Sequence, residues 1–475
     1  MSDRAHSGPI LLIDDITDEH VHLCALFLAP KGEVPADLVV KGQSHTPERL
    51  SESRGLGLYR VRFTVPADQP ARYTWDGKTY DLAMDFTGDL HIGYVSCNGQ
   101  EHGDMDRPER ERNAMWARLG QRHADHPMSL LLHGGDQLYA DEVTDTHRLT
   151  FDWPESVPTD VSEEDLNHLF ETLFDEFFAR YAKLYMGEAF GWLAARVPSL
   201  SQWDDHDICD GWGSQPEDST NSAVGQTLFA AAKKAALLFQ HGCTEDDTPP
   251  RFADRTAGHL GWSVKSHGLT IMAPDLRAER TRHRVMGPKG WSATTAMAAE
   301  ARGSRVLLMS SVPLLGPRLS ILEALMNLSP GLQKYEDDLR DQWQSRAHRA
   351  EWQRMLRLVD GLANHPDTEV TAISGEIHLA TRATMTKAGE LSFHQLVASG
   401  ITHPPPPKAW ASALGSLAYF GEAPLPGHKI RIRPLPGQRH RYVAERNALI
   451  LHREDDRWTA VWDLEHSGPT PPLAI

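Results

Sequence analysis

LLLHGGDQLYAD, residues 130–141, is the stretch that decides the fold. Its three leucines form an apolar run that is typical of a buried parallel strand, and Gly134 and Gly135 then let the backbone turn sharply. Asp136 and Tyr139 follow at once, so we expect both side chains to point into a crevice beyond the carboxyl end of the strand, where open α/β sheets place their sites. A loop aspartate is often only a turn former, but the strand-Gly-Gly-Asp order favours a functional carboxylate here.

Two further apolar runs end in side chains that can bind metal ions. The β-branched run at 369–374 is followed by Gly375, Glu376 and His378, and the i, i+2 spacing puts the carboxylate and the imidazole on the same side of extended chain. A short run at 93–96 ends in Cys97. A lone buried cysteine is usually an inert small hydrophobe. Because Cys97 follows a strand, as Asp136 and Glu376 do, it is a candidate thiolate ligand.

The densest group of ionisable side chains is WDDHDICD, residues 203–210, with four carboxylates and an imidazole. Like charges at this density raise one another's pKa values unless cations neutralise them, and carboxylate oxygens and imidazole nitrogens are ligands for such cations. Asp205, His206 and Asp210 are the candidate functional residues of this stretch. An acidic loop or a helix cap is the alternative interpretation.

Composition indicates a large chain that easily buries a core, with 475 residues and a formal net charge of −17. This charge argues against nucleic acid as a stable partner and against binding an anionic membrane surface. The four cysteines are widely spaced, no stretch of 18 apolar residues occurs, and the N-terminus lacks a basic segment, so we expect a cytoplasmic protein without membrane insertion. The sequence does not indicate an oligomeric state.

The pattern of apolar runs and turn residues differs between residues 1–86 and residues 87–475. Short, partly alternating runs divided by proline and glycine turns, such as the Asp-Gly hairpin at 75–78, indicate a small N-terminal antiparallel β-sandwich. From Gly93 onward apolar strands alternate with helical stretches, including 170–184 and 223–240, as in a layered α/β core. A closing β-hairpin is expected at about 447–462.

Taken in chain order, these motifs resemble those of the alkaline phosphatase D family, the PhoD-like metallophosphatases. The pieces that carry the resemblance are Ser96-Cys97, Gly135-Asp136-x-x-Tyr139-x-Asp141, Trp203-Asp204-Asp205-His206-Asp207 and Gly375-Glu376-Ile377-His378, with weaker ones at 275–277, 310–315, 341–343 and 399–404. The resemblance covers residues 87–465 and implies a two-sheet metallophosphatase sandwich flanked by helices after the N-terminal sandwich. Two positions depart from the family pattern: Glu376 stands where Asp is usual, and Asp210 stands where Asn is usual.

The ligand set predicts two or more metal ions. Asp136 is the expected bridge because its strand-end position is central and a carboxylate can offer an oxygen to each ion. Cys97 and Tyr139 favour ferric iron through charge donation, and the resemblance implies iron at that position. Asp205, Asp210, Glu376 and His378 suit a second, oxygen-preferring site, for which the resemblance implies calcium. Mn²⁺ and Zn²⁺ remain open.

These residues predict a hydrolase of small phosphate esters, either a phosphomonoesterase or a phosphodiesterase, in which a metal-bound hydroxide attacks phosphorus. His206 is the candidate for protonating the leaving oxygen, with a structural or metal-bound role as its alternative. Arg277 would clamp a phosphate oxygen or else pair with Asp275. Two other classes stay open: a catalytically weak binding or scaffold protein that keeps the fold, and a metal hydrolase of another ester or of an amide.

Overall fold

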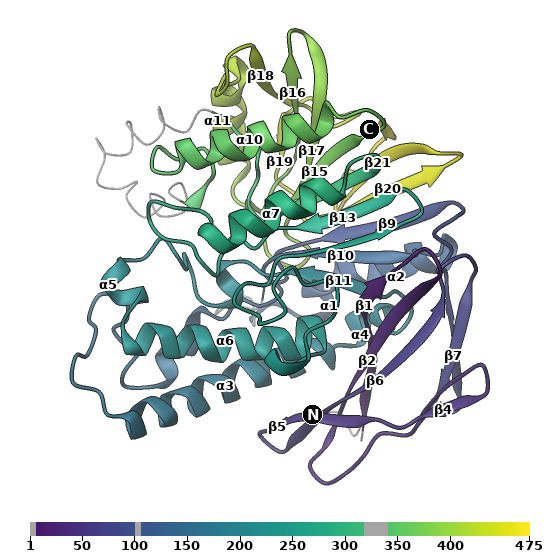
Figure 1. The fold of residues 1–475 in the computed structure, drawn as a ribbon, viewed down its shortest axis with the longest axis vertical. Helices are drawn as coiled ribbons and strands as arrows, with labels where there is room; N and C mark the ends of the chain where they lie inside the picture. The colour runs from purple at the N-terminus through teal and green to yellow at the C-terminus, as the bar shows by residue number, and fades with distance from the viewer. Residues whose placement is uncertain (1–5, 100–105, 318–340) are drawn as a thin grey trace.

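Two large β-sheets pack face to face in the computed structural model, which describes residues 6–99, 106–317 and 341–475 (Figure 1). Within those residues the larger sheet has eleven strands in the order β22-β21-β20-β9-β10-β11-β1-β2-β6-β5, with β23 paired to β21. Its strands are β1 (Ser7–Ile16), β2 (His20–Pro30), β5 (Glu48–Ser53), β6 (Leu56–Pro66), β9 (Leu90–Val95), β10 (Leu130–Gly134), β11 (Ser199–Gln202), β20 (Asn447–Glu454), β21 (Arg457–Leu464), β22 (Gly468–Pro469) and β23 (Leu473–Ala474).

The second sheet has eight strands among the described residues, in the order β12-β13-β14-β15-β17-β16-β18, with β19 paired to β16. They are β12 (Trp262–Ser266), β13 (Leu269–Ala273), β14 (Arg305–Ser310), β15 (Glu369–Ser374), β16 (Ala380–Lys387), β17 (Glu390–Val397), β18 (His428–Arg433) and β19 (Tyr442–Val443). The central strands are parallel in both sheets: β9, β10 and β11 in the first, and β13, β14, β15 and β17 in the second. Their carboxyl ends are where the predicted site residues lie.

The leucines of β10 pack against a different layer on each face of the first sheet. Leu132 packs toward the second sheet in one hydrophobic cluster with Leu307 and Ile373. Leu131, whose side chain points to the opposite face, belongs to a second cluster with helix residues such as Phe178. Because both faces of the strand are covered, β10 is apolar throughout, as the sequence predicts.

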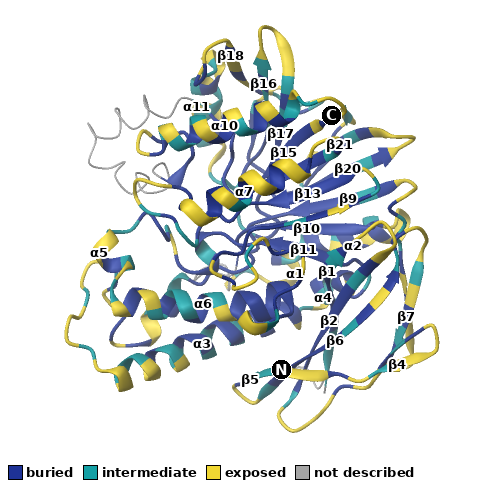
Figure 2. Cartoon of the chain, viewed as in Figure 1, coloured by how far each residue is buried: buried dark blue, intermediate teal, exposed yellow. Residues whose placement is uncertain are grey.

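Helices cover the outer faces of the sandwich (Figure 1). Among the described residues they are α1 (Glu109–Arg112), α2 (Ala114–Asp125), α3 (Glu163–Tyr185), α4 (Glu188–Ala194), α5 (Glu217–Thr220), α6 (Ala223–His241), α7 (Pro288–Glu300), α10 (Arg349–Ala363) and α11 (Lys408–Leu417). Helices α3 and α6 pack on the first sheet, and α7 and α10 on the second. Figure 2 shows the central strands as buried, with exposed residues along the outer sides of these helices. Among the described residues, no helix is long and apolar enough to cross a membrane.

Local signals set the ends of α6. The side chain of Ser222 accepts a hydrogen bond from the backbone N–H of Gly225 at 3.0 Å, which caps the first turn. Gly242 ends the helix in the left-handed conformation, with φ of 63°. The helix predicted at 223–240 is thus confirmed to within one residue.

Residues 6–86 form antiparallel strands in two layers, yet one layer belongs to the large sheet. Strands β1, β2, β6 and β5 continue that sheet, because β1 pairs in parallel with β11 through Leu12 and Ser199. The other layer is a four-stranded sheet in the order β4-β3-β7-β8, with bounds β3 (Leu38–Val40), β4 (Gln43–His45), β7 (Ala71–Trp75) and β8 (Lys78–Leu82). The expected α/β fold class is confirmed; a domain boundary at 86/87 stays a prediction, and the sheet runs across it.

The closing hairpin consists of β20 and β21, and β20 pairs antiparallel with β9. Asp455 and Asp456 form its turn, both with positive φ. The expected hairpin at 447–462 therefore lies beside the strand that leads to Cys97.

Candidate metal centre and active site

The candidate ligands follow the carboxyl ends of four parallel strands: Cys97 after β9, Asp136 after β10, Asp205 after β11, and Glu376 with His378 after β15. Four of them have φ in the left-handed region: Cys97 at 56°, Asp136 at 53°, Glu376 at 65° and His378 at 52°. Such backbone conformations are uncommon for residues other than glycine and gather at functional sites. The chain therefore bends sharply at each strand end to turn these side chains toward one edge of the sandwich.

Two glycines of the 130–141 stretch make this approach sterically feasible. A Cβ at Gly134 would overlap the phenol ring of Tyr94. Gly135 has φ of 110°, and a Cβ there would lie 2.8 Å from the Cβ of Asp204. Any larger residue at Gly135 would push β10 and β11 apart at the place where their carboxylates meet.

One group of ligand atoms joins Cys97, Asp136 and His378, all within 4.8 Å of one another. The thiol of Cys97 donates to Oδ2 of Asp136 at 3.3 Å. The hydroxyl of Tyr139 lies 2.6 Å from Nε2 of His378, so its phenol oxygen borders the same group. The structure thus brings together a thiol, a phenol, an imidazole and a carboxylate.

A second group joins Asp136 with Asp204 and Asp205, again with ligand atoms within 4.8 Å of one another. Asp136 is the residue that the two groups share. Oδ1 of Asp136 and Oδ2 of Asp204 are buried without a hydrogen-bond partner, although buried carboxylate oxygens are normally paired. They belong to a cluster of buried like charges, which is an arrangement that a bound cation would satisfy. The residues present therefore fit a metal centre.

His206 stands beside this cluster with an orienting partner. Its Nδ1 lies 2.9 Å from Oδ1 of Asp141, and its ring stacks on Tyr139 with centroids 4.2 Å apart. Its Nε2 lies 4.0 Å from a carboxylate oxygen of Asp210, whose side chain is 71% exposed. Asp205, His206 and Asp210 also form a third group of neighbouring ligand atoms, so Asp210 lies at the open rim of the site.

Burial and mutual repulsion shift the pKa values of the metal-free site. Burial raises the pKa of Asp136 well above its usual value, and the carboxylates of Asp204 and Asp205 add to the rise despite the opposing effect of His206. Burial likewise raises the pKa of Asp204 to about 6, although Arg277 opposes it. Burial lowers the pKa of His206, but Asp141 and Asp205 outweigh this effect and raise it well above the usual value, so the imidazole is held in its protonated form.

Arg277 is placed differently from the phosphate clamp that we predicted. Its side chain is fully buried, and it forms ion pairs with Asp204, with Asp205 at 3.2 Å and with Asp341 at 2.6 Å. The alternative ion pair with Asp275 is also wrong, because Asp275 accepts a hydrogen bond from the backbone N–H of Arg277 instead, at 2.8 Å. Three carboxylates surround the guanidinium and leave no side facing a substrate, so Arg277 holds the acidic cluster in place.

Glu376 lies in the same pocket, but its two oxygens each accept a hydrogen bond from Nε2 of Gln342 at 2.8 Å. Burial raises its pKa well above the usual value, and the nearby Asp341 adds to this rise. Within the described part of the chain Glu376 is not a member of the three ligand groups around Asp136 and Asp205. Its role as a ligand stays a prediction.

The sequence analysis missed three residues of the site. Asp204 was given no ligand role, although it stands in the quoted WDDHD motif. His403 stacks on His378 with ring centroids 3.6 Å apart, and Asp341 completes the pairing of Arg277. Both lie in stretches that carried weaker parts of the family resemblance, and that was the one signal that could have found them.

A cavity of about 550 Å³ opens over these residues. Acidic and imidazole side chains line one part of it, among them Asp136, Asp205, His206 and His378. The remainder is largely apolar and is formed by Leu315, Ile377, the four prolines at 404–407, Trp410, Leu414 and Tyr442. The candidate metal centre is thus reached through a pocket with an apolar wall.

The chain is similar to PhoD-type phosphatases in sequence and in fold. Residues 104–335 match the family model described as PhoD related phosphatase. A solved structure of PhoD covers 100% of this chain and 89% of its own, with a TM-score of 0.61 at 12% sequence identity, so it shares the fold. The resemblance to the alkaline phosphatase D family is confirmed.

The chain is also similar to the uncharacterized protein YGR266W of Saccharomyces cerevisiae, with 22% identity over 452 residues. The match covers 75% of this chain and 64% of the yeast protein, so the chain spans less than two thirds of that relative. The residues matched by the family model include Asp136, Asp204, Asp205 and His206, whereas Cys97 and His378 lie outside them.

Proposed function

We propose that the protein hydrolyses small phosphate esters, monoesters or diesters, at a carboxylate-rich centre that holds at least two metal ions. One observation carries this proposal above the others: Asp136 belongs to two groups of neighbouring ligand atoms, one with Cys97 and His378 and one with Asp204 and Asp205. A single carboxylate shared in this way can bridge two cations, and paired cations are the usual means of stabilising an in-line displacement at phosphorus.

The donor types suggest which residues would hold which ion. Cys97, Tyr139, Asp136 and His378 would hold the ion that prefers thiolate and phenolate, for which ferric iron is our first choice. Asp136, Asp204 and Asp205 would hold an oxygen-preferring ion, for which we favour calcium, with Mn²⁺ or Zn²⁺ as alternatives. When bound, such ions lower the pKa of water and neutralise charge on a phosphoryl group.

The chain's own residues supply positioning and proton transfer. Asp141 fixes Nδ1 of His206, which leaves Nε2 directed toward the rim of the pocket near Asp210. In its protonated form, which the neighbouring Asp141 favours, His206 can give the Nε2 proton to the leaving oxygen of the ester. Arg277 keeps Asp204 and Asp205 in place from the buried side.

The apolar wall of the pocket suggests a preference among esters. Trp410, Tyr442 and the prolines at 404–407 offer aromatic and aliphatic contact beside the acidic residues. We therefore expect esters with an aryl or alkyl group next to the phosphate to be better substrates than highly polar ones such as sugar phosphates. The net charge of −17 disfavours nucleic acid as a partner, and we keep a cytoplasmic location as part of this proposal.

The test combines elemental analysis of the purified full chain with hydrolysis of p-nitrophenyl phosphate and bis(p-nitrophenyl) phosphate. We expect about two metal ions per chain, turnover that chelation abolishes and metal restores, and loss of both metal and turnover in Asp136→Asn. Asp145→Asn, at an exposed acid of the neighbouring segment, is the matched control and should behave as wild type.

Two outcomes would replace this proposal with an alternative. Bound metal without turnover of any ester would favour the binding or scaffold protein. Metal-dependent hydrolysis of carboxylic esters or amides, with phosphate esters untouched, would identify a different metal hydrolase.

A further inference from the structure

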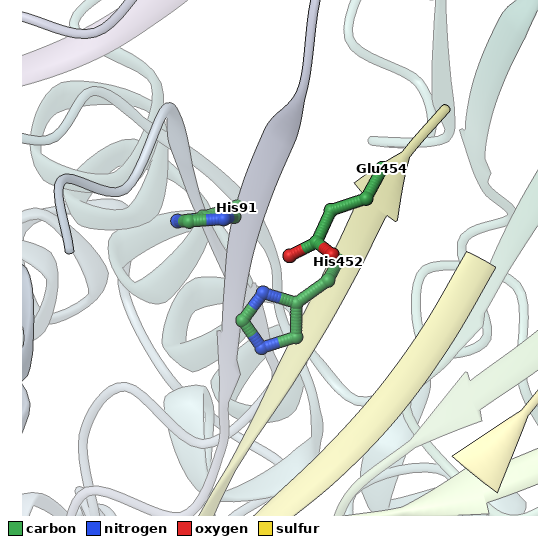
Figure 3. A group of neighbouring side chains, drawn as sticks. All are labelled: His91, His452 and Glu454. Carbon is green, nitrogen blue, oxygen red and sulfur yellow. The ribbon is translucent and has the colours of Figure 1, made fainter. Parts of the chain in front are cut away.

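Two histidines face each other across a strand pair outside the candidate active site. His91 on β9 and His452 on β20 are directly opposite in the antiparallel register. Their ring centroids lie 4.7 Å apart, and the rings meet edge to face at 77°. Figure 3 shows the two imidazoles on neighbouring strands, with the carboxylate of Glu454 turned toward the space between them.

Glu454 completes a group of three donors. It lies two residues beyond His452 on β20, and side chains at i and i+2 of a strand share one face. One ligand atom of each of His91, His452 and Glu454 lies within 4.8 Å of the other two. Nδ1 of His452 is buried and has no hydrogen-bond partner in the described part of the structure, which is unusual for a buried imidazole nitrogen.

This group is separate from the candidate metal centre. His91 lies at the start of β9, whereas Cys97 follows the end of that strand. Six residues of extended chain span roughly 20 Å, so the two groups lie at opposite ends of strand β9. A third imidazole, His126 after the end of α2, lies 6.3 Å from His91 between ring centroids and is close enough to take part.

We propose that His91, His452 and Glu454 form a second metal site, which takes a transition-metal ion of the Zn²⁺ class. Two imidazoles and one carboxylate are a donor set that suits Zn²⁺, Cu²⁺ or Ni²⁺ and suits Ca²⁺ or Mg²⁺ poorly, because those ions prefer oxygen ligands. An ion bound there joins β9 to the closing hairpin, and so it stabilises the folded chain by binding that state alone.

The experiment measures Zn²⁺ binding to the full chain by equilibrium dialysis in wild type, His452→Gln and Glu454→Gln. Glu454 is exposed, so its variant is expected to fold even if replacement of the half-buried His452 disturbs the sheet. His22→Gln is the matched control, because His22 is also a histidine on a β-strand and has His20 as a ring neighbour at 6.3 Å.

We expect wild type to bind one Zn²⁺ more than His452→Gln, and Glu454→Gln to bind that ion at least about tenfold more weakly. Phosphate-ester hydrolysis should be unchanged in both variants, and wild type loaded with Cu²⁺ should show electron paramagnetic coupling to two imidazole nitrogens. Equal stoichiometry and affinity in wild type and both variants would overturn the proposal. An equal loss in His22→Gln would overturn it too, since binding would then be a general property of surface histidines.

Discussion

Asp136→Asn is the substitution that separates the charge of the candidate bridge from its shape. Asparagine has nearly the same volume as aspartate and tolerates the left-handed conformation found at this position, where φ is 53°. The variant should therefore fold, and any change should come from the missing negative charge.

The metal-free protein and the metal-loaded protein should respond in opposite directions. Without metal, burial and the neighbouring carboxylates raise the pKa of Asp136, so its ionised form destabilises the fold as the pH rises above the ordinary aspartate value. Removing this charge should stabilise the metal-free chain at neutral pH by about 2 kcal/mol, the difference between an uncompensated buried charge, about 3–5 kcal/mol, and a neutral buried polar group, about 1–3 kcal/mol. With metal, the variant should lose the stabilisation that the ions give and at least about 10³-fold in turnover, which is about 4 kcal/mol of barrier.

Urea denaturation with and without a chelator, together with kcat/KM for p-nitrophenyl phosphate, measures both effects. If the variant were less stable than wild type with chelator present, the negative charge of Asp136 would not destabilise the metal-free chain, contrary to what its oxygen without a hydrogen-bond partner indicates. Wild-type metal content and turnover in Asp136→Asn would show that Asp136 is not the bridge.

Four further expectations concern single residues. If Tyr139 ligates ferric iron, the iron-loaded protein should be coloured and Tyr139→Phe should bleach it; a colourless wild type with iron bound would contradict that assignment. Glu376→Asp should lower turnover about 10-fold, or about 1.4 kcal/mol, because the shorter arm misplaces a carboxylate held by a neighbouring amide; activity equal to wild type would mean that the glutamate is a tolerated change. Arg277→Met should destabilise the chain by about 3–5 kcal/mol in urea denaturation, since it leaves Asp204 and Asp205 without their cation and Asp341 with Arg280 alone; wild-type stability would refute the pairing. Burial lowers the pKa of His133 to about 4, so His133 takes up a proton at a higher pH in the unfolded chain than in the folded chain, and the free energy of unfolding falls as the pH drops from about 6.5 to about 4. His133→Gln should remove up to about 3 kcal/mol of this loss. An unchanged pH profile of stability in the variant would contradict this expectation.

Local patterns were sufficient to predict the elements that bear the site. The apolar run before Gly134 is a buried strand, and α3 and α6 contain the two helices expected at 170–184 and 223–240. These predictions succeed because hydrophobic periodicity, caps and glycine turns act over a few residues.

Contacts between distant segments were beyond the reach of such patterns. The pairing of Leu12 with Ser199 joins the N-terminal strands to the central sheet. The sequence could not predict this pairing, because the buried side of β1 would be apolar both in a separate sandwich and in the large sheet. The partners of Arg277 lie 64 and 73 residues away in Asp341 and Asp204, so the sequence around 275–277 offers Asp275 as the obvious partner. Sequence alone also could not separate Asp204 from Asp205, because a short 3-10 turn at Asp205–Asp207 decides which carboxylate faces which neighbour.

The charge balance of the site connects these contacts to function. Counted as ionised, the carboxylates of Asp136, Asp204, Asp205 and Asp341 carry four negative charges, and Arg277 and Arg280 carry two positive charges, which leaves a formal charge of −2 among groups that are all buried. A phosphate ester would be repelled by such a site. Two divalent ions would bring the total to +2, and a ferric ion in place of one of them to +3. Arg277 and Arg280 therefore neutralise enough charge from the buried side for the chain to fold around its acids, while the unpaired oxygens of Asp136 and Asp204 leave the remaining charge to the metal ions that would attract the substrate.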